Sequence, residues 1–111
     1  MALIVKCKRP QELLDQFESK INHFEIVSWA MDEDEDFTVT NGNWSFKAWM
    51  RPIVEDDRLV FGYVSSTNHQ VTKGLYGIFH GRLAATLLAH FDDMIESIEI
   101  QPQLDSQYDM F

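Results

Sequence analysis

Residues 44–66 read WSFKAWMRPIVEDDRLVFGYVSS, and this stretch carries the clearest evidence for the fold. In its first half, large apolar side chains alternate with mostly polar ones, which is the two-residue period of a half-buried strand. The apolar side of this strand consists of Trp44, Phe46, Ala48 and Met50. From Arg58 to Ser66 apolar residues fall on both faces, which is typical of a strand at the centre of a sheet. The pattern therefore predicts two strands joined by the acidic turn at 55–57.

Pro52 lies near the end of the first of these strands. Proline has no N–H to donate to a sheet ladder, so it is confined to edge strands, strand starts and bulges. The sequence therefore predicts that this strand is an edge strand or bulges at Pro52.

The rest of the chain predicts two helices and further strands around this pair. A first helix begins at Pro10, because proline suits the first helical turn, and a longer helix runs from Thr72 to Ile95. The apolar residues of the first helix follow at the spacing of one face: Leu13, Leu14, Phe17 and Ile21. Further strands are predicted at 3–7, 24–31, 37–40 and 97–101.

The predicted order of elements is β-α-β-β-β-β-α-β. This order favours an α+β fold in which a mainly antiparallel sheet of five to six strands carries both helices on one face. The chain of 111 residues has the usual size of one domain. We expect a single compact domain over 1–101, followed by a flexible acidic C-terminal tail over 102–111.

The charge of the chain is strongly acidic and unevenly distributed. The formal net charge is −9, and no lysine or arginine follows Arg82, whereas six acidic residues do. Such a surface repels phosphate, which argues against direct binding of nucleic acid or of an anionic membrane and favours a basic protein partner. The N-terminal residues do not have the order of charges of a signal peptide. We therefore expect a cytoplasmic, bacterial-type protein.

Residues that could carry catalysis or bind a metal do not form a recognised motif. Asp32, Asp34 and Asp36 match the first ligands of an EF-hand loop, but Phe37 stands where that loop needs glycine. The sequence therefore predicts a solvated hairpin tip there. Cys7 is the single cysteine, and its lysine neighbours at 6 and 8 could lower its pKa, although a buried structural thiol is the favoured interpretation.

His80 falls within the apolar arc of the long helix, which favours a structural role in the core. The spacing of the four histidines does not form a metal-binding motif, and no nucleotide-binding loop is present. We accordingly predict no metal and no cofactor, and a non-enzymatic protein is the favoured interpretation.

The long helix combines an apolar arc with a ridge of small residues. The apolar arc contains Tyr76, Phe79, Leu83, Leu87, Leu88, Phe91 and Met94. Small residues recur every fourth position, at Gly77, Gly81, Ala85 and Ala89. Glycine within a helix costs about 1 kcal/mol, so two glycines call for a packing reason. The first helix could pack on this ridge, or a helix from another subunit or a partner could do so.

The C-terminal pentapeptide resembles a known docking motif. Gln107, Asp109, Met110 and Phe111 match the pattern by which many bacterial proteins bind the DNA polymerase sliding clamp, whereas Tyr108 stands where leucine is usual. The resemblance implies that a free tail would place Met110 and Phe111 in an apolar groove, with polar contacts from Gln107.

Three classes of function follow from the sequence. The favoured one is a small acidic protein–protein interaction module, an adaptor or inhibitor, with a possible homodimer. The alternatives are a sliding-clamp-associated factor that docks through residues 107–111, and a small-ligand binder or enzyme of unknown class.

Overall fold

The computed structural model describes residues 1–43, 45, 47–65, 73–103 and 107–109. Within these residues, six strands form one antiparallel sheet in the order β2-β3-β4-β5-β1-β6, together with two α-helices and a short 3-10 helix. The elements are β1 (Leu3–Lys6), α1 (Pro10–Asn22), β2 (Trp29–Met31), β3 (Phe37–Val39), β4 (Ala48–Val54), β5 (Arg58–Ser65), α2 (Lys73–Phe91), η1 (Asp92–Met94) and β6 (Ser97–Ile100). The predicted α+β fold and the order of its elements are confirmed.

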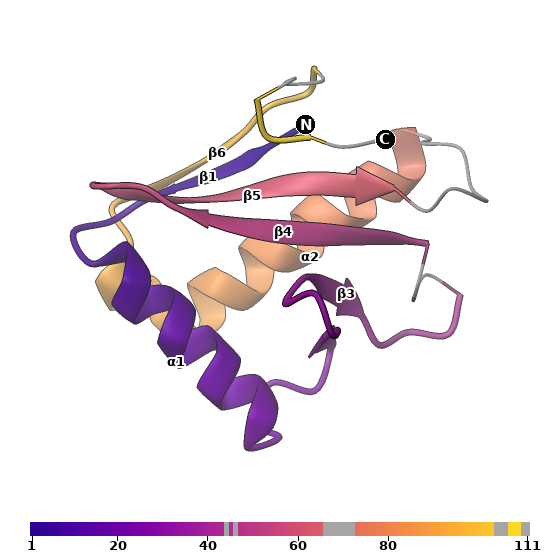
Figure 1. Cartoon of the computed structure of the whole chain (residues 1–111), viewed down its shortest axis with the longest axis horizontal. Helices are drawn as coiled ribbons and strands as arrows, with labels where there is room; N and C mark the ends of the chain where they lie inside the picture. Colours follow the sequence, from indigo (N-terminus) through magenta and orange to yellow (C-terminus); the bar gives the residue numbers. More distant parts are fainter. Residues whose placement is uncertain (44, 46, 66–72, 104–106, 110–111) are drawn as a thin grey trace.

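Both α-helices lie on the same face of the sheet (Figure 1). Side chains along a strand therefore alternate between the face that the helices cover and the opposite face. In β5, Leu59, Phe61 and Tyr63 belong to the core that α1 and α2 cover, whereas Val60 belongs to a smaller cluster on the opposite face. β5 lies between β4 and β1, and its residues from Leu59 to Tyr63 are all buried. The predicted central strand is therefore confirmed.

Phe17 of α1 lies at the centre of the core. Its ring centroid is 4.7 Å from that of Phe37 in β3, 6.2 Å from that of Phe61 in β5 and 6.4 Å from that of Phe91 in α2. The contacts with Phe61 and Phe91 have edge-to-face geometry, which aromatic pairs favour. One side chain thus joins two strands and both helices.

The strand predicted over 24–31 is shorter in the structure, because α1 ends in a turn that uses the first of these residues. The amides of Glu25 and Ile26 both donate to the carbonyl of Lys20. Phe24 has a φ of 60° and an exposed fraction of 82%. This backbone cannot continue into a strand, and β2 begins only at Trp29.

β4 is not an edge strand of the sheet, which corrects one of the two predictions made from Pro52. It lies between β3 and β5. However, β3 begins at Phe37, which is opposite Met50. Pro52 lies beyond this point, where the described residues place no strand on the β3 side of β4. The proline therefore occupies a locally unpaired part of an internal strand.

A substitution at Phe17 tests the aromatic centre of the core. We expect Phe17→Ala to lower the free energy of unfolding by about 3–5 kcal/mol, because a fully buried ring is lost and a cavity remains. Phe24→Ala removes the same ring from an exposed site and is the matched control, with an expected change within about 0.5 kcal/mol. Urea unfolding measures both values. Equal effects of the two substitutions would contradict this description of the core.

Candidate functional site

The small-residue ridge of α2 faces away from the protein. Gly77, Gly81, Ala85 and Ala89 are all exposed. A Cβ atom built on Gly77 or Gly81 has no atom of the described residues within 4 Å. The interpretation in which α1 packs on this ridge is therefore wrong. The core contacts of α2 come from the other side of the helix, at Phe79, Leu83, Leu87 and Phe91.

The outer face of α2 differs in charge from the rest of the chain. We define this face as the exposed residues Gly74, Gly77, Gly81, Arg82, Ala85, Leu88 and Ala89. Leu88 is 52% exposed, although it was expected in the buried arc. Between residues 74 and 91 the sequence contains no aspartate or glutamate and one arginine, within a chain that has 18 acidic residues. A surface helix usually has charged and polar residues on its solvent side, so this face is unusual.

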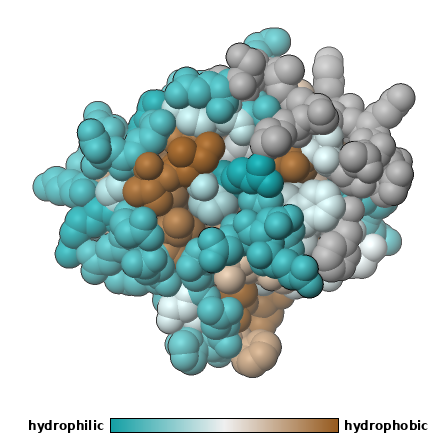
Figure 2. Space-filling view, in the orientation of Figure 1, coloured by the Kyte–Doolittle hydropathy of each residue, from teal (hydrophilic) through white to brown (hydrophobic). Residues whose placement is uncertain are grey.

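Most of the molecular face seen in Figure 2 is hydrophilic, and its hydrophobic side chains form separate areas. This is expected for a chain with a net charge of −9. Among the described helices, none is long and apolar enough to cross a membrane.

The C-terminal residues 107–109 lie on the face of the sheet opposite the helices. Tyr108 is 5% exposed and packs with Ala2, Ile4 and Val60. Asp109 is 8% exposed. Figure 1 shows this end of the chain passing over the sheet, close to the N-terminus. Residues 107–109 therefore differ from the free tail that was predicted for 102–111.

Polar contacts hold Tyr108 in place. Its hydroxyl donates to a carboxylate oxygen of Glu55 at 2.9 Å and accepts from the Arg58 guanidinium at 2.9 Å. Burial and the bond to Glu55 raise the pKa of the Tyr108 phenol. The hydrogen bonds from Arg58 and Tyr108 lower the pKa of Glu55. The phenol therefore stays protonated and the carboxylate ionised at neutral pH, as this arrangement requires.

Asp109 accepts a hydrogen bond from the backbone N–H of Tyr63 at 2.8 Å. Its second carboxylate oxygen lies 3.0 Å from the amino group of Met1. The Tyr63 N–H needs an acceptor because β1 begins opposite Phe61, so that β5 extends beyond its neighbour at this point. Asp109 therefore completes the hydrogen bonding of β5 where the sheet ladder ends.

Gly62 permits this close approach. A Cβ atom at this position would lie 2.0 Å from the carbonyl oxygen of Tyr108, which is far inside van der Waals contact. Glycine inside a strand often marks a place where another backbone comes close. Gly62 is therefore the signal in the sequence for this contact, and the predicted tail over 102–111 does not take it into account.

The resemblance of residues 107–111 to a clamp-binding peptide stays a prediction. Gln107 is exposed, whereas Tyr108 and Asp109 are buried on the sheet. Met110 and Phe111 lie outside the described residues. A peptide of this kind enters its groove in an extended form, so residues 108 and 109 would first have to leave the sheet.

The acidic hairpin tip brings carboxylates together, but those of Asp32 and Asp36 already have partners. Ligand atoms of Asp32, Asp34 and Asp36 lie within 4.8 Å of one another. Oδ1 of Asp32 accepts hydrogen bonds from the amides of Asp34 and Asp36. Both oxygens of Asp36 bind Arg51, at 3.0 and 2.8 Å. The Asp32 carboxylate thus stabilises the turn between β2 and β3, and the Asp36 charge is neutralised by Arg51.

Cys7 and His80 are both buried. Burial is the main effect that raises the pKa of the Cys7 thiol, contrary to the lowering considered for its lysine neighbours. A protonated, buried thiol is a poor nucleophile. The ring of His80 stacks on Tyr63 at 5.8 Å, and its nitrogens contact the backbone carbonyls of Tyr76 and Met1. These surroundings favour structural roles for both residues.

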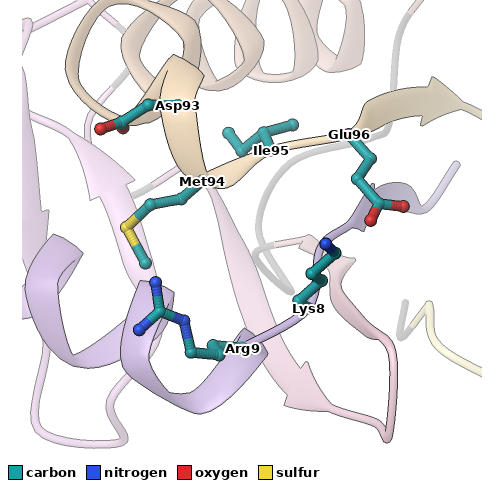
Figure 3. A pocket seen from close by; sticks show the side chains of 6 residues that line it. All are labelled: Lys8, Arg9, Asp93, Met94, Ile95 and Glu96. Carbon is teal, nitrogen blue, oxygen red and sulfur yellow. The ribbon is translucent and has the colours of Figure 1, made fainter.

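A cavity of about 230 Å³ lies between the loop before α1 and the segment from η1 to β6 (Figure 3). It is lined by Lys8, Arg9, Asp93, Met94, Ile95 and Glu96. Its two cationic side chains are balanced by two carboxylates. Arg9 is also paired with Glu12 at 3.0 Å. The lining therefore does not favour an anionic or a cationic ligand.

Comparisons with known proteins do not add a function: no protein-family model, no curated protein and no solved structure matches this chain. Two surfaces of the described residues are candidates for recognition, the outer face of α2 and the sheet face under residues 107–109.

Two glycines should respond to the same substitution in opposite directions. We expect Gly62→Ala to lower the free energy of unfolding by about 1–3 kcal/mol, because the new methyl group overlaps Tyr108. We expect Gly81→Ala to raise it by about 0.5–1 kcal/mol, because alanine favours the helix and the methyl group meets open space. Urea unfolding of dilute protein measures both. A stabilising Gly62→Ala would show that residues 107–109 do not lie against β5.

Proposed function

We propose that this protein is a non-enzymatic protein–protein interaction module, an adaptor or inhibitor, and that the outer face of α2 is its self-association surface. The observation that supports the proposal is the exposure of this face. Apart from Arg82 it is built from small and apolar residues, and it contains no acidic residue in an otherwise acidic chain.

The glycines of α2 have no evident use within a single copy. Gly77 and Gly81 weaken the helix, by about 1 kcal/mol each relative to alanine. Space for a larger side chain is present at both positions. Small residues become useful when a second helix approaches, since packed helix axes are about 8–10 Å apart. A ridge with one small residue per turn allows the shorter distances in this range.

The distribution of charge favours a second copy as the occupant. Two copies with a net charge of −9 repel each other over most of their surfaces. The repulsion is weakest where acidic residues are missing, at the outer face of α2. A twofold interface uses the same patch on both copies, so one face without acidic residues satisfies both sides of the contact.

An antiparallel pair of α2 helices also gives complementary ends. Asp92 and Asp93 directly follow α2 and are exposed. In an antiparallel pair these carboxylates lie beside the N-terminal end of the other helix. Anionic groups are stabilised at helix N-termini, by about 0.3–1 kcal/mol each. The arrangement thus brings each acidic end to the positive end of its neighbour.

The expected dimer is weak. A helix of 19 residues is about 28 Å long, and contact along a single pair of helices buries less surface than the roughly 1,200–2,000 Å² of a stable interface. We therefore expect reversible association in the micromolar range or weaker. Salt should strengthen it, because screening reduces the repulsion between the two acidic bodies.

A further protein partner would be basic, because the chain is strongly acidic and the exposed residues Asp92 and Asp93 directly follow α2. Binding of a basic surface there would weaken as salt is added, since opposite charges are screened. The sign of the salt dependence therefore distinguishes this contact from self-association through α2.

Gly81→Leu tests the self-association surface. Sedimentation velocity over a concentration series should show a monomer–dimer equilibrium for the wild type, with more dimer at higher salt. The variant should stay monomeric, because a leucine side chain on the ridge keeps the helices apart. Gly42→Leu places the same side chain in open space in a loop outside α2 and should behave as the wild type does.

Circular dichroism would verify that both variants are folded. A wild type that remains monomeric up to its solubility limit at high salt would contradict self-association. Dimerisation of Gly81→Leu with unchanged affinity would exclude the outer face of α2 as the interface.

A further inference from the structure

We propose that the sheet face under residues 107–109 is a peptide-recognition site. Its ligand class is an extended segment in which tyrosine is followed by an acidic residue, and the chain's own Tyr108 and Asp109 occupy it in this structure. The proposal is independent of the outer face of α2, because the two surfaces lie on opposite sides of the sheet.

The floor of the site is apolar and has room for a peptide backbone. Ala2, Ile4 and Val60 are buried beneath Tyr108, and Ile53 packs at the edge of this cluster. Gly62 lacks the side chain that would otherwise fill the space taken by the Tyr108 carbonyl. The backbone of a ligand can therefore lie directly on β5, which a larger residue at 62 would prevent.

The site distinguishes tyrosine from phenylalanine. A hydroxyl group is both a donor and an acceptor, and the site offers one partner for each role. Glu55 accepts from the hydroxyl, and Arg58 donates to it. Arg58 and Glu55 also bind each other at 2.5 Å, which holds both side chains in position. Both are partly exposed, with side-chain exposed fractions of 38% and 28%. We therefore expect a modest preference for tyrosine over phenylalanine.

The site also selects an acidic residue after the tyrosine. The Tyr63 N–H lies at the end of the ladder between β5 and β1 and donates to the Asp109 carboxylate. That carboxylate is fully buried, with a side-chain exposed fraction of 0%. A ligand without an acceptor there would leave the Tyr63 N–H buried and unsatisfied, which costs binding.

Because the chain's own segment occupies the site, an outside peptide must compete with it for binding. A tethered segment is present at an effective concentration in the millimolar range, so an outside peptide must displace it. Displacement has a second consequence, because it releases residues 107–109 from the sheet. Binding of a tyrosine–acid segment from a partner and presentation of the chain's own C-terminal peptide are therefore coupled.

The test uses the full chain with its own segment disabled by Tyr108→Ala and Asp109→Ala. The probe is a fluorescently labelled peptide of residues 103–111, followed by fluorescence polarisation. We expect saturable binding to this variant and binding at least about tenfold weaker to the wild type, whose own segment competes. Tyr108→Ala alone is the second receptor and keeps the test valid if the double variant does not fold, as judged by circular dichroism.

Substituted probes test the recognition itself. We expect the affinity to fall about tenfold or more when the probe carries Tyr108→Ala or Asp109→Ala, and by a smaller factor for Tyr108→Phe, which removes only the hydroxyl. A receptor that also carries Arg58→Ala should have a weaker preference for tyrosine over phenylalanine, because only Glu55 then binds the hydroxyl.

Absence of binding to the folded receptors would overturn the proposal. Equal binding of the intact probe and of a probe with both alanine substitutions would do the same, because the contact would then be non-specific. Neither result affects self-association through α2, which sedimentation tests separately.

Discussion

The burial of β5 on both faces is the constraint on which the rest of this structure depends. Its residues from Leu59 to Tyr63 are all buried, and successive side chains point to opposite sides of the sheet. One side is covered by the helices, through Phe17 and Phe79 among others. The other side needs a cover as well, and Tyr108 supplies it. Gly62 leaves the space that the carbonyl of Tyr108 occupies beside the strand.

The protein therefore has two apolar surfaces beyond its main core, and only one of them is covered by other described residues. The second face of the sheet is covered by the chain's own residues 107–109, whose polar contacts reach Arg58 and Tyr63. The outer face of α2 has no such cover among the described residues. A protein partner is the simplest cover for an exposed helix face that lacks acidic residues on an acidic protein. Both surfaces thus favour a role in protein recognition, one through a helix and one through a peptide.

Local patterns predicted the elements well, because burial repeats every two residues in a strand and every 3.6 in a helix. Local patterns did not predict the features that have no repeating pattern in the sequence. Tyr63 and Asp109 are 46 residues apart, and that contact leaves no repeating signal. The orientation of α2 was also ambiguous, since the helix is apolar or small on nearly all sides, and Leu88 was placed in the wrong arc. The positive φ of Phe24, which shortens β2, has no signature in a residue that is neither glycine nor asparagine.

Hydrogen exchange at the Tyr63 amide tests most directly whether residues 107–109 close the second face of the sheet. This amide donates to the carboxylate of Asp109, so we expect its protection to depend on that side chain. We expect slow exchange in the wild type and much faster exchange in Asp109→Ala and in Gly62→Ala. Exchange at Phe61, which is paired with both β1 and β4, should change far less. Equal exchange rates for Tyr63 in the wild type and in Asp109→Ala would contradict the account.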